Sequence, residues 1–104
     1  VAVIGGGAGG VELALGLAAK FRREGPPVRL ELITATRRPL EDRPPAVQRL
    51  VGQVLLKHGV SLEAGTRIVG CDEDGPAAQI VDDGRRLPCD LALWVTRAAP
   101  PPFL

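Results

Sequence analysis

Segments rich in apolar residues alternate along this chain with breaks rich in glycine, proline or charged residues. Four short segments predict strands at 1–4, 28–34, 60–64 and 91–96. The first of these is apolar throughout, as expected for a parallel strand that is covered on both faces. Longer segments predict one helix over 10–23 and another over 45–58. In the second helix, apolar residues recur at i, i+3, i+4, i+7 and i+8, namely Val47, Leu50, Val51, Val54 and Leu55.

The spacing changes after the third predicted strand, where short segments are separated by turn-forming residues. These segments are 66–71, 77–81 and 85–87. The dipeptide Asp83-Gly84 favours a two-residue type I′ hairpin between the last two. This part of the chain is therefore expected to form a small antiparallel β-meander before the last parallel strand.

The first predicted strand leads directly into the pattern G-x-G-x-x-G, formed by Gly5, Gly7 and Gly10, and this leads into the first helix. That context is far more specific than the glycines alone. The first glycine permits a tight turn, the second lets a diphosphate approach the main chain, and the third lets the helix pack closely. Amide groups and the dipole at the helix start favour an anion. A glycine-rich turn that binds nothing is the alternative.

Together these elements predict an α/β fold, namely a three-layer Rossmann-like parallel sheet with helices on its faces and the meander before its last strand. A ligand of such a fold lies over the carboxyl ends of the strands, which here means at the glycine turn. Residues 1–104 are expected to form a single domain.

Composition excludes several other classes of protein. The net charge of +1 gives no indication of nucleic-acid binding or of binding to an acidic membrane surface. Hydrophobic residues make up 45% of the chain and aromatic residues only 3%, so the core must be aliphatic. Cys71 and Cys89 form no metal-binding or redox motif, which favours idle thiols in a reducing cytoplasm. With no secretion signal and no apolar run long enough to span a bilayer, a cytoplasmic protein is expected.

The first predicted helix has an unusually apolar first half. Between Val11 and Ala19 its one charged residue is Glu12, whereas a surface helix would show a polar stripe within two turns. We therefore expect a further domain to cover it. The chain also begins inside a strand without Met and ends after a proline run, as expected for a piece of a larger protein.

Three features are similar to a known family: the sequence G-G-G-A-G-G-V-E-L-A from Gly5, the meander, and the closing D-L-A-L-W-V-T-R-A-A-P. They resemble the NAD(P)H-binding domain of the pyridine nucleotide-disulfide oxidoreductase superfamily, nearest to type II NADH dehydrogenase-like flavoproteins, including those fused to selenide, water dikinase. The resemblance covers the whole chain. It implies that this domain is inserted into an FAD-binding domain of the same polypeptide and that NAD(P)H lies across the glycine turn, facing the flavin.

The candidate cofactor-binding residues come from the glycine turn, from the end of the second strand and from the end of the last strand. They are Gly5, Gly6, Gly7, Ala8, Gly9, Gly10, Glu12, Thr34, Arg37, Arg38, Thr96 and Arg97. The resemblance places Glu12 near the nicotinamide; the alternative is an acid that stabilises the first helical turn. Asp90 matches the start of the family motif D-x-x-x-x-A-T-G, but Arg97 stands where its glycine would be, which disfavours close approach of a cofactor on that side.

The end of the second strand bears on the choice between NADH and NADPH. An acid there normally binds the ribose hydroxyls of NAD, and a nearby Arg accommodates a 2′-phosphate. Here Thr34 takes the place of the acid, and Arg37 and Arg38 follow. We expect tolerance of NADPH, or preference for it. Alternatively, the two arginines are a solvated pair in a loop.

The sequence thus predicts an FAD-dependent NAD(P)H oxidoreductase module, which positions NAD(P)H so that hydride passes to a flavin in the missing domain. The flavin then reduces a small-molecule acceptor such as a quinone. No catalytic side chain and no metal site is assigned, and any membrane association of the full protein is not encoded here. One alternative is the FAD-binding half of the same enzyme. Another is a non-catalytic nucleotide-binding remnant, for which Arg97 is the supporting feature.

Overall fold

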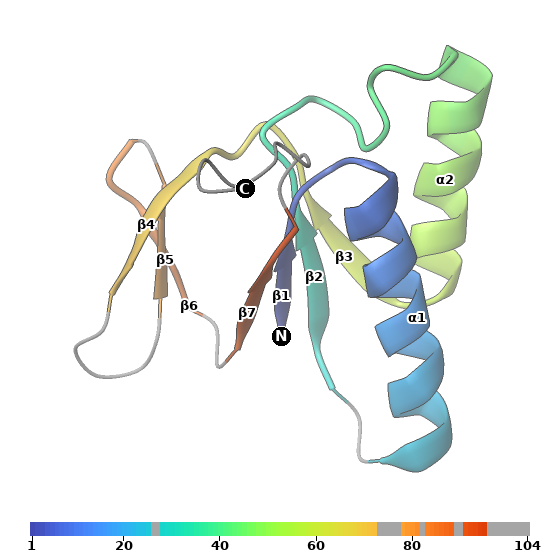
Figure 1. Cartoon of the computed structure of the whole chain (residues 1–104), viewed down its shortest axis with the longest axis horizontal. Helices are drawn as coiled ribbons and strands as arrows, with labels where there is room; N and C mark the ends of the chain where they lie inside the picture. The colour runs from blue at the N-terminus through green and yellow to red at the C-terminus, as the bar shows by residue number, and fades with distance from the viewer. Residues whose placement is uncertain (26–27, 73–77, 82, 89–90, 96–104) are drawn as a thin grey trace, which may run out of the picture.

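The computed structural model describes residues 1–25, 28–72, 78–81, 83–88 and 91–95 (Figure 1). A four-stranded sheet has the order β3-β2-β1-β7, in which every neighbouring pair is parallel. Its strands are β1 (Ala2–Ile4), β2 (Leu30–Ile33), β3 (Val60–Glu63) and β7 (Ala92–Trp94). The helices are α1 (Ala8–Glu24) and α2 (Pro45–Lys57). A second, antiparallel sheet has the order β4-β5-β6, from β4 (Ile68–Asp72), β5 (Ala78–Val81) and β6 (Arg86–Pro88).

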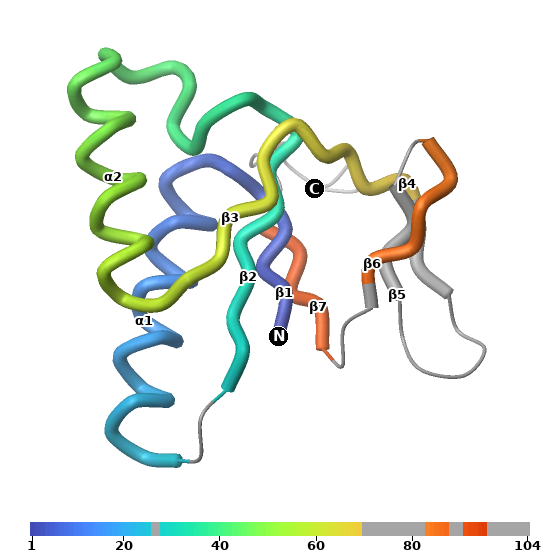
Figure 2. The backbone as a smooth tube through the Cα atoms, turned by 180° about the vertical axis from the view of Figure 1, so that it is seen from behind, coloured from blue at the N-terminus to red at the C-terminus, as the bar shows by residue number. Residues whose placement is uncertain are grey.

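Three layers result, with both helices on one face of the parallel sheet and the antiparallel sheet on the other (Figures 1 and 2). Both helices share a face because the strand order moves in one direction from β1 to β3 and each crossover is expected to be right-handed. Strand alternation divides β1 accordingly: Val3 lies in the helix-side core, and Ala2 and Ile4 lie in the core on the other side. The predicted three-layer Rossmann-like α/β fold is confirmed, but among the described residues the antiparallel sheet, and not a helix, covers the second face of the parallel sheet.

The helix-side core is aliphatic, as the composition requires. Its buried members are Val3, Val11, Ala14, Leu30, Leu32, Leu55 and Val60. The half-buried leucines of α1, at positions 13, 15 and 17, pack against this core. The chain itself therefore covers part of the apolar surface of α1, and covering of the remainder by a further domain stays a prediction. Among the described residues, neither helix is both long and apolar enough to cross a membrane.

The predicted apolar face of α2 is only partly correct. Leu55 is buried and Val51 and Val54 are half-buried, but Val47 and Leu50 are 39% and 59% exposed. The helix packs on β3 at the edge of the sheet, and its first turns rise above the carboxyl ends of the strands (Figure 1). Side chains at the start of α2 therefore extend beyond the layer that would bury them.

The predicted two-residue hairpin at Asp83-Gly84 is wrong, although the antiparallel meander is present. Ile80 pairs with Arg86, whereas a two-residue loop would pair it with Leu87. The carboxylate of Asp83 accepts hydrogen bonds from the backbone N–H and Nε of Arg85, and the backbone bond is the first cause of its lowered pKa. Gly84 has a φ of 91°, as is common in the longer loops that close hairpins with glycine.

Candidate functional site

The glycine turn connects β1 to α1 at the carboxyl end of the sheet, between the ends of β2 and β7 (Figure 1). The N–H of Gly5 donates to the carbonyl of Ile33 at 3.0 Å, which continues the pairing with β2. On the other side, the N–H of Val95 donates to the carbonyl of Ile4 at 2.8 Å. Strands on both sides thus fix where the turn begins.

Two glycines of the turn are required by close backbone contacts. Gly5 has a φ of 141°, and a Cβ there would overlap the backbone carbonyl of Val95. A Cβ at Gly10 would overlap the carbonyl of Gly5 itself. The third glycine of the pattern therefore lets α1 approach the turn rather than the body of the sheet. Any larger residue at position 10 would push the helix away from the strand end.

The outer side of the turn is open. A Cβ at Gly7 would meet no atom within 4 Å, and Gly7, Ala8 and Gly9 are all exposed. Gly7 is the N-cap of α1 and supplies no side-chain hydrogen bond to the first turn. Main-chain amides at a helix start that lack a side-chain cap are suited to an anion. The residues present therefore fit a diphosphate, with bare backbone on the open side and tight packing behind it.

Thr34 forms the packed side of the turn. Its side chain is 1% exposed, and its Cγ2 lies 2.9 Å from where a Cβ on Gly6 would stand. Its Oγ1 donates to the carbonyl of Thr36 at 3.0 Å. The hydroxyl is thus used within the protein, so direct contact of Thr34 with a nucleotide stays a prediction.

Arg37 and Arg38 are exposed in the loop that follows β2. This loop is bonded to the turn, because the N–H of Leu40 donates to the carbonyl of Gly6 at 2.7 Å. Arg37 and Arg38 lie between the end of β2 and Leu40, so this hydrogen bond holds the segment that carries them close to the glycine turn. No acidic side chain stands at the end of β2, where Ile33 is followed by Thr34 and Ala35.

Glu12 is exposed on α1. It lies in the second turn of the helix, because the helix begins at Ala8, two residues before its predicted start. A stabilising effect on the helix dipole falls off beyond the first turn, which weakens the purely structural interpretation of this acid. Thr96 and Arg97 lie outside the described residues, as do Cys89, Asp90 and the side chain of Cys71.

Comparison with known families decides the class of the chain. A family model for pyridine nucleotide-disulphide oxidoreductases matches residues 1–102. The chain belongs to this family. The comparison with curated protein sequences found no relative.

Solved structures share the fold of this pyridine nucleotide-disulphide oxidoreductase domain. They include a ferredoxin reductase from Rhodopseudomonas palustris, with 23% identity and a TM-score of 0.75 over 90% of this chain and 22% of the other. The reductase in a covalent putidaredoxin reductase–putidaredoxin complex has 28% identity and a TM-score of 0.72 over 92% and 23% of the two chains. An engineered water-forming NADPH oxidase bound to NADPH has 20% identity and a TM-score of 0.76 over 92% and 20%. The chain spans about a fifth of the length of these proteins.

Two residues of the oxidoreductase domain belong to the site although the sequence did not single them out as binding residues. Val95 supplies the carbonyl against which Gly5 packs, and its Cγ1 lies 3.1 Å from where a Cβ on Gly9 would stand. Leu40 supplies the bond from the loop to Gly6. The sequence did offer a signal for Val95, because this residue occupies the alanine position of the family motif A-T-G at the end of the last strand. Nothing in the local sequence marked Leu40.

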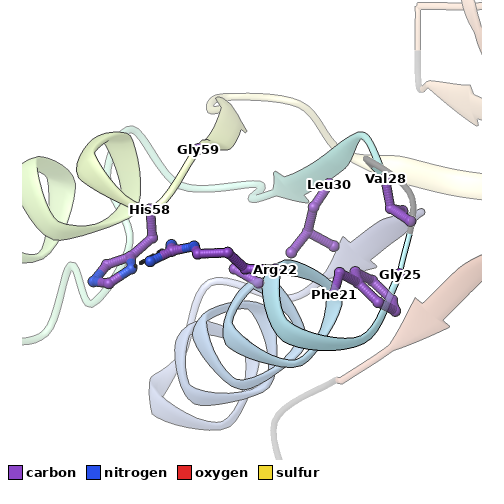
Figure 3. A pocket seen from close by; sticks show the side chains of 8 residues that line it. Phe21, Arg22, Gly25, Val28, Leu30, His58 and Gly59 are labelled. Carbon is purple, nitrogen blue, oxygen red and sulfur yellow. Dashed lines mark hydrogen bonds between the residues drawn. The ribbon is translucent and has the colours of Figure 1, made fainter.

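A hollow of about 350 Å³ lies at the opposite end of the two helices (Figure 3). Side chains from the end of α1, the start of β2 and the end of α2 line it, among them Phe21, Val28 and Leu30. Arg22 and His58 face each other there, with Nη2 of Arg22 2.9 Å from Nδ1 of His58 (Figure 3). Because this hollow is at the amino ends of the strands, it is separate from the glycine turn, and the fold rule places the ligand at the other end.

Proposed function

We propose that this domain binds NAD(P)H at the glycine turn and positions it for hydride transfer to FAD, which another domain of the complete protein holds. The observation that carries the proposal is the turn itself, in which Gly5 and Gly10 leave no room for side chains while Gly7 faces open space. Membership of the family supports the same function. The complete protein would then be a flavin-dependent oxidoreductase with a quinone-like or other small-molecule acceptor, similar to type II NADH dehydrogenases.

In this proposal the chain contributes binding and orientation. The amides at the start of α1 hold the diphosphate, and the helix dipole favours its negative charge. Exposed Glu12 lies one helical turn further along, on the path towards the nicotinamide that the family resemblance implies. When bound, the nicotinamide supplies the hydride, and the chemistry resides in the cofactors. In this proposal the described residues bind the nucleotide and hold it in one orientation.

The same site favours NADPH over NADH. A carboxylate at the end of β2 would repel a 2′-phosphate, and here Thr34 is the residue at that position. Arg37 and Arg38 are exposed immediately beyond it and can form charge-assisted hydrogen bonds to phosphate. Because these bonds form only with the phosphorylated ribose of NADPH, they raise the affinity for NADPH and leave the affinity for NADH unchanged.

Calorimetric titration of the complete polypeptide with NADPH and NADH tests both parts of the proposal. Binding of either nucleotide supports the NAD(P)H site, and absence of heat with both rejects it. We expect a Kd for NADPH that is lower by about tenfold, the effect of one strong charge-assisted contact. The double variant Arg37→Ala/Arg38→Ala should lose this preference while keeping its affinity for NADH. Arg23→Ala/Arg49→Ala, which removes two exposed arginines from the helices, is the matched control for charge.

A further inference from the structure

Leu40 has an unusual backbone conformation. It is the one non-glycine residue with a positive φ, 57°, among the residues that the structure describes. A left-handed conformation costs a leucine about 1–2 kcal/mol, so the surroundings must hold it there. Asparagine or glycine would adopt the same conformation with less strain.

Three contacts hold Leu40 in this conformation. Its N–H donates to the carbonyl of Gly6 at 2.7 Å, and its own carbonyl accepts a hydrogen bond from the N–H of Arg43 at 2.8 Å. Its side chain packs against the helix-side core. The residue before it, Pro39, is fully buried. The strained residue therefore fastens the loop to the glycine turn and to the core at one point.

The other end of the same loop is also fixed. Thr36 accepts hydrogen bonds at its carbonyl from the hydroxyl of Thr34 and from the N–H of Gly65, at 3.0 and 2.8 Å. The hydroxyl of Thr36 donates to the carbonyl of Arg38 at 2.7 Å. The backbone that carries the two arginines is thus bonded on both sides, while their side chains remain exposed.

We propose that Leu40 is a positioning residue for nucleotide selection. Its bond to Gly6 ties the loop of Arg37 and Arg38 to the turn that would hold the diphosphate. The distance between a bound diphosphate and the backbone of the two arginines is then fixed, and only the two exposed side chains remain free to move. In NADPH the ribose limits the separation of the 2′-phosphate from the diphosphate, so a loop backbone held at one place keeps both arginines within reach of that phosphate. This inference rests on the proposed function.

A pair of variants at position 40 isolates the bond. Leu40→Pro removes the N–H and forces a negative φ, whereas Leu40→Asn keeps the N–H and tolerates the left-handed conformation. Both lose the packing of the leucine side chain. In the complete polypeptide we expect Leu40→Pro to reduce the ratio of Kd for NADH to Kd for NADPH by about tenfold, and Leu40→Asn to keep the ratio of the unmodified protein.

A double-mutant cycle distinguishes positioning from general damage to the fold. If Leu40 acts through the arginines, Leu40→Pro should not change the Kd ratio further in the Arg37→Ala/Arg38→Ala background. An unchanged ratio in Leu40→Pro alone, or an equal further loss in that background, overturns the inference. Should Leu40→Pro fail to fold, Leu40→Val, which keeps the N–H but disfavours positive φ, should lower the ratio in its place.

The result for the unmodified protein separates this inference from the proposed function. Binding of neither nucleotide rejects the function and the inference together. A clear NADPH preference that survives in Leu40→Pro rejects the inference and leaves the function intact.

Discussion

The two ends of the parallel sheet are built in different ways. At the carboxyl end, backbone packs against backbone: Gly10 against the carbonyl of Gly5, and Gly5 against the carbonyl of Val95. At the amino end, side chains line a hollow, where Arg22 contacts His58 (Figure 3). The first end leaves main-chain amides exposed to a ligand, and the second presents side chains that line a hollow and include a hydrogen-bonded pair.

This difference between backbone packing and side-chain contacts predicts which end of the domain tolerates substitution. A side chain that contacts another side chain can be shortened at a modest cost, since neighbours and water adjust. A backbone atom that contacts another backbone atom leaves no such freedom, because moving it moves the strand or helix. We therefore expect the same type of substitution to have large effects at the glycine turn and small effects at the opposite end.

The largest effect is expected for Gly10→Ala. The new methyl group would overlap the carbonyl of Gly5, so α1 must shift away from β1. Overpacking of this kind costs about 3 kcal/mol, and the unfolding free energy in urea should fall by about that amount. Nucleotide binding should weaken as well, because the amides at the start of α1 move with the helix.

Gly16→Ala is the matched control for this prediction. Gly16 lies in the same helix, is exposed, and a Cβ there would meet no atom within 4 Å. The substitution should stabilise the protein by about 0.5–1 kcal/mol through helix propensity alone. Equal changes in stability for the two variants would show that position 10 has no special packing.

Gly7→Ala is expected to separate binding from folding. Its Cβ would point into open space, so stability should fall by less than about 1 kcal/mol, the cost of alanine in place of glycine at an N-cap. The same methyl group stands where a diphosphate would approach the main chain. The Kd for either nucleotide should therefore rise about tenfold or more by calorimetry, since roughly 1.4 kcal/mol corresponds to tenfold. Unchanged affinity would mean that the ligand does not approach the turn from this side.

The features of the site that the sequence predicted are local ones. A strand, three spaced glycines and a helix follow one another without interruption, so the turn from Gly5 to Gly10 and the fold around it could be recognised. The exposed arginines after β2 were found for the same reason, as they directly follow a predicted strand end. Each of these interpretations needed only neighbours along the chain.

The features that were missed depend on contacts between distant segments. The bond from Leu40 to Gly6 and the contact of Val95 with Gly5 exist only after the strands have assembled. Whether Leu50 is buried depends on how far α2 extends beyond the sheet. Periodicity identifies a helix and its apolar side, but it does not say which turns of the helix will find a partner.

The smallest effect is expected at the opposite end of the sheet, for His58→Ala. This variant removes the hydrogen bond from Arg22, which joins the ends of two helices at an exposed position. The unfolding free energy in urea should fall by at most about 1 kcal/mol. Lys57→Ala, at the neighbouring exposed position of α2, controls for the loss of a long polar side chain. The Kd for NADPH should be the same in both variants as in the unmodified protein. A tenfold change in His58→Ala alone would contradict the separation of the two ends, because a side-chain contact remote from the glycine turn would then affect the binding site through the sheet.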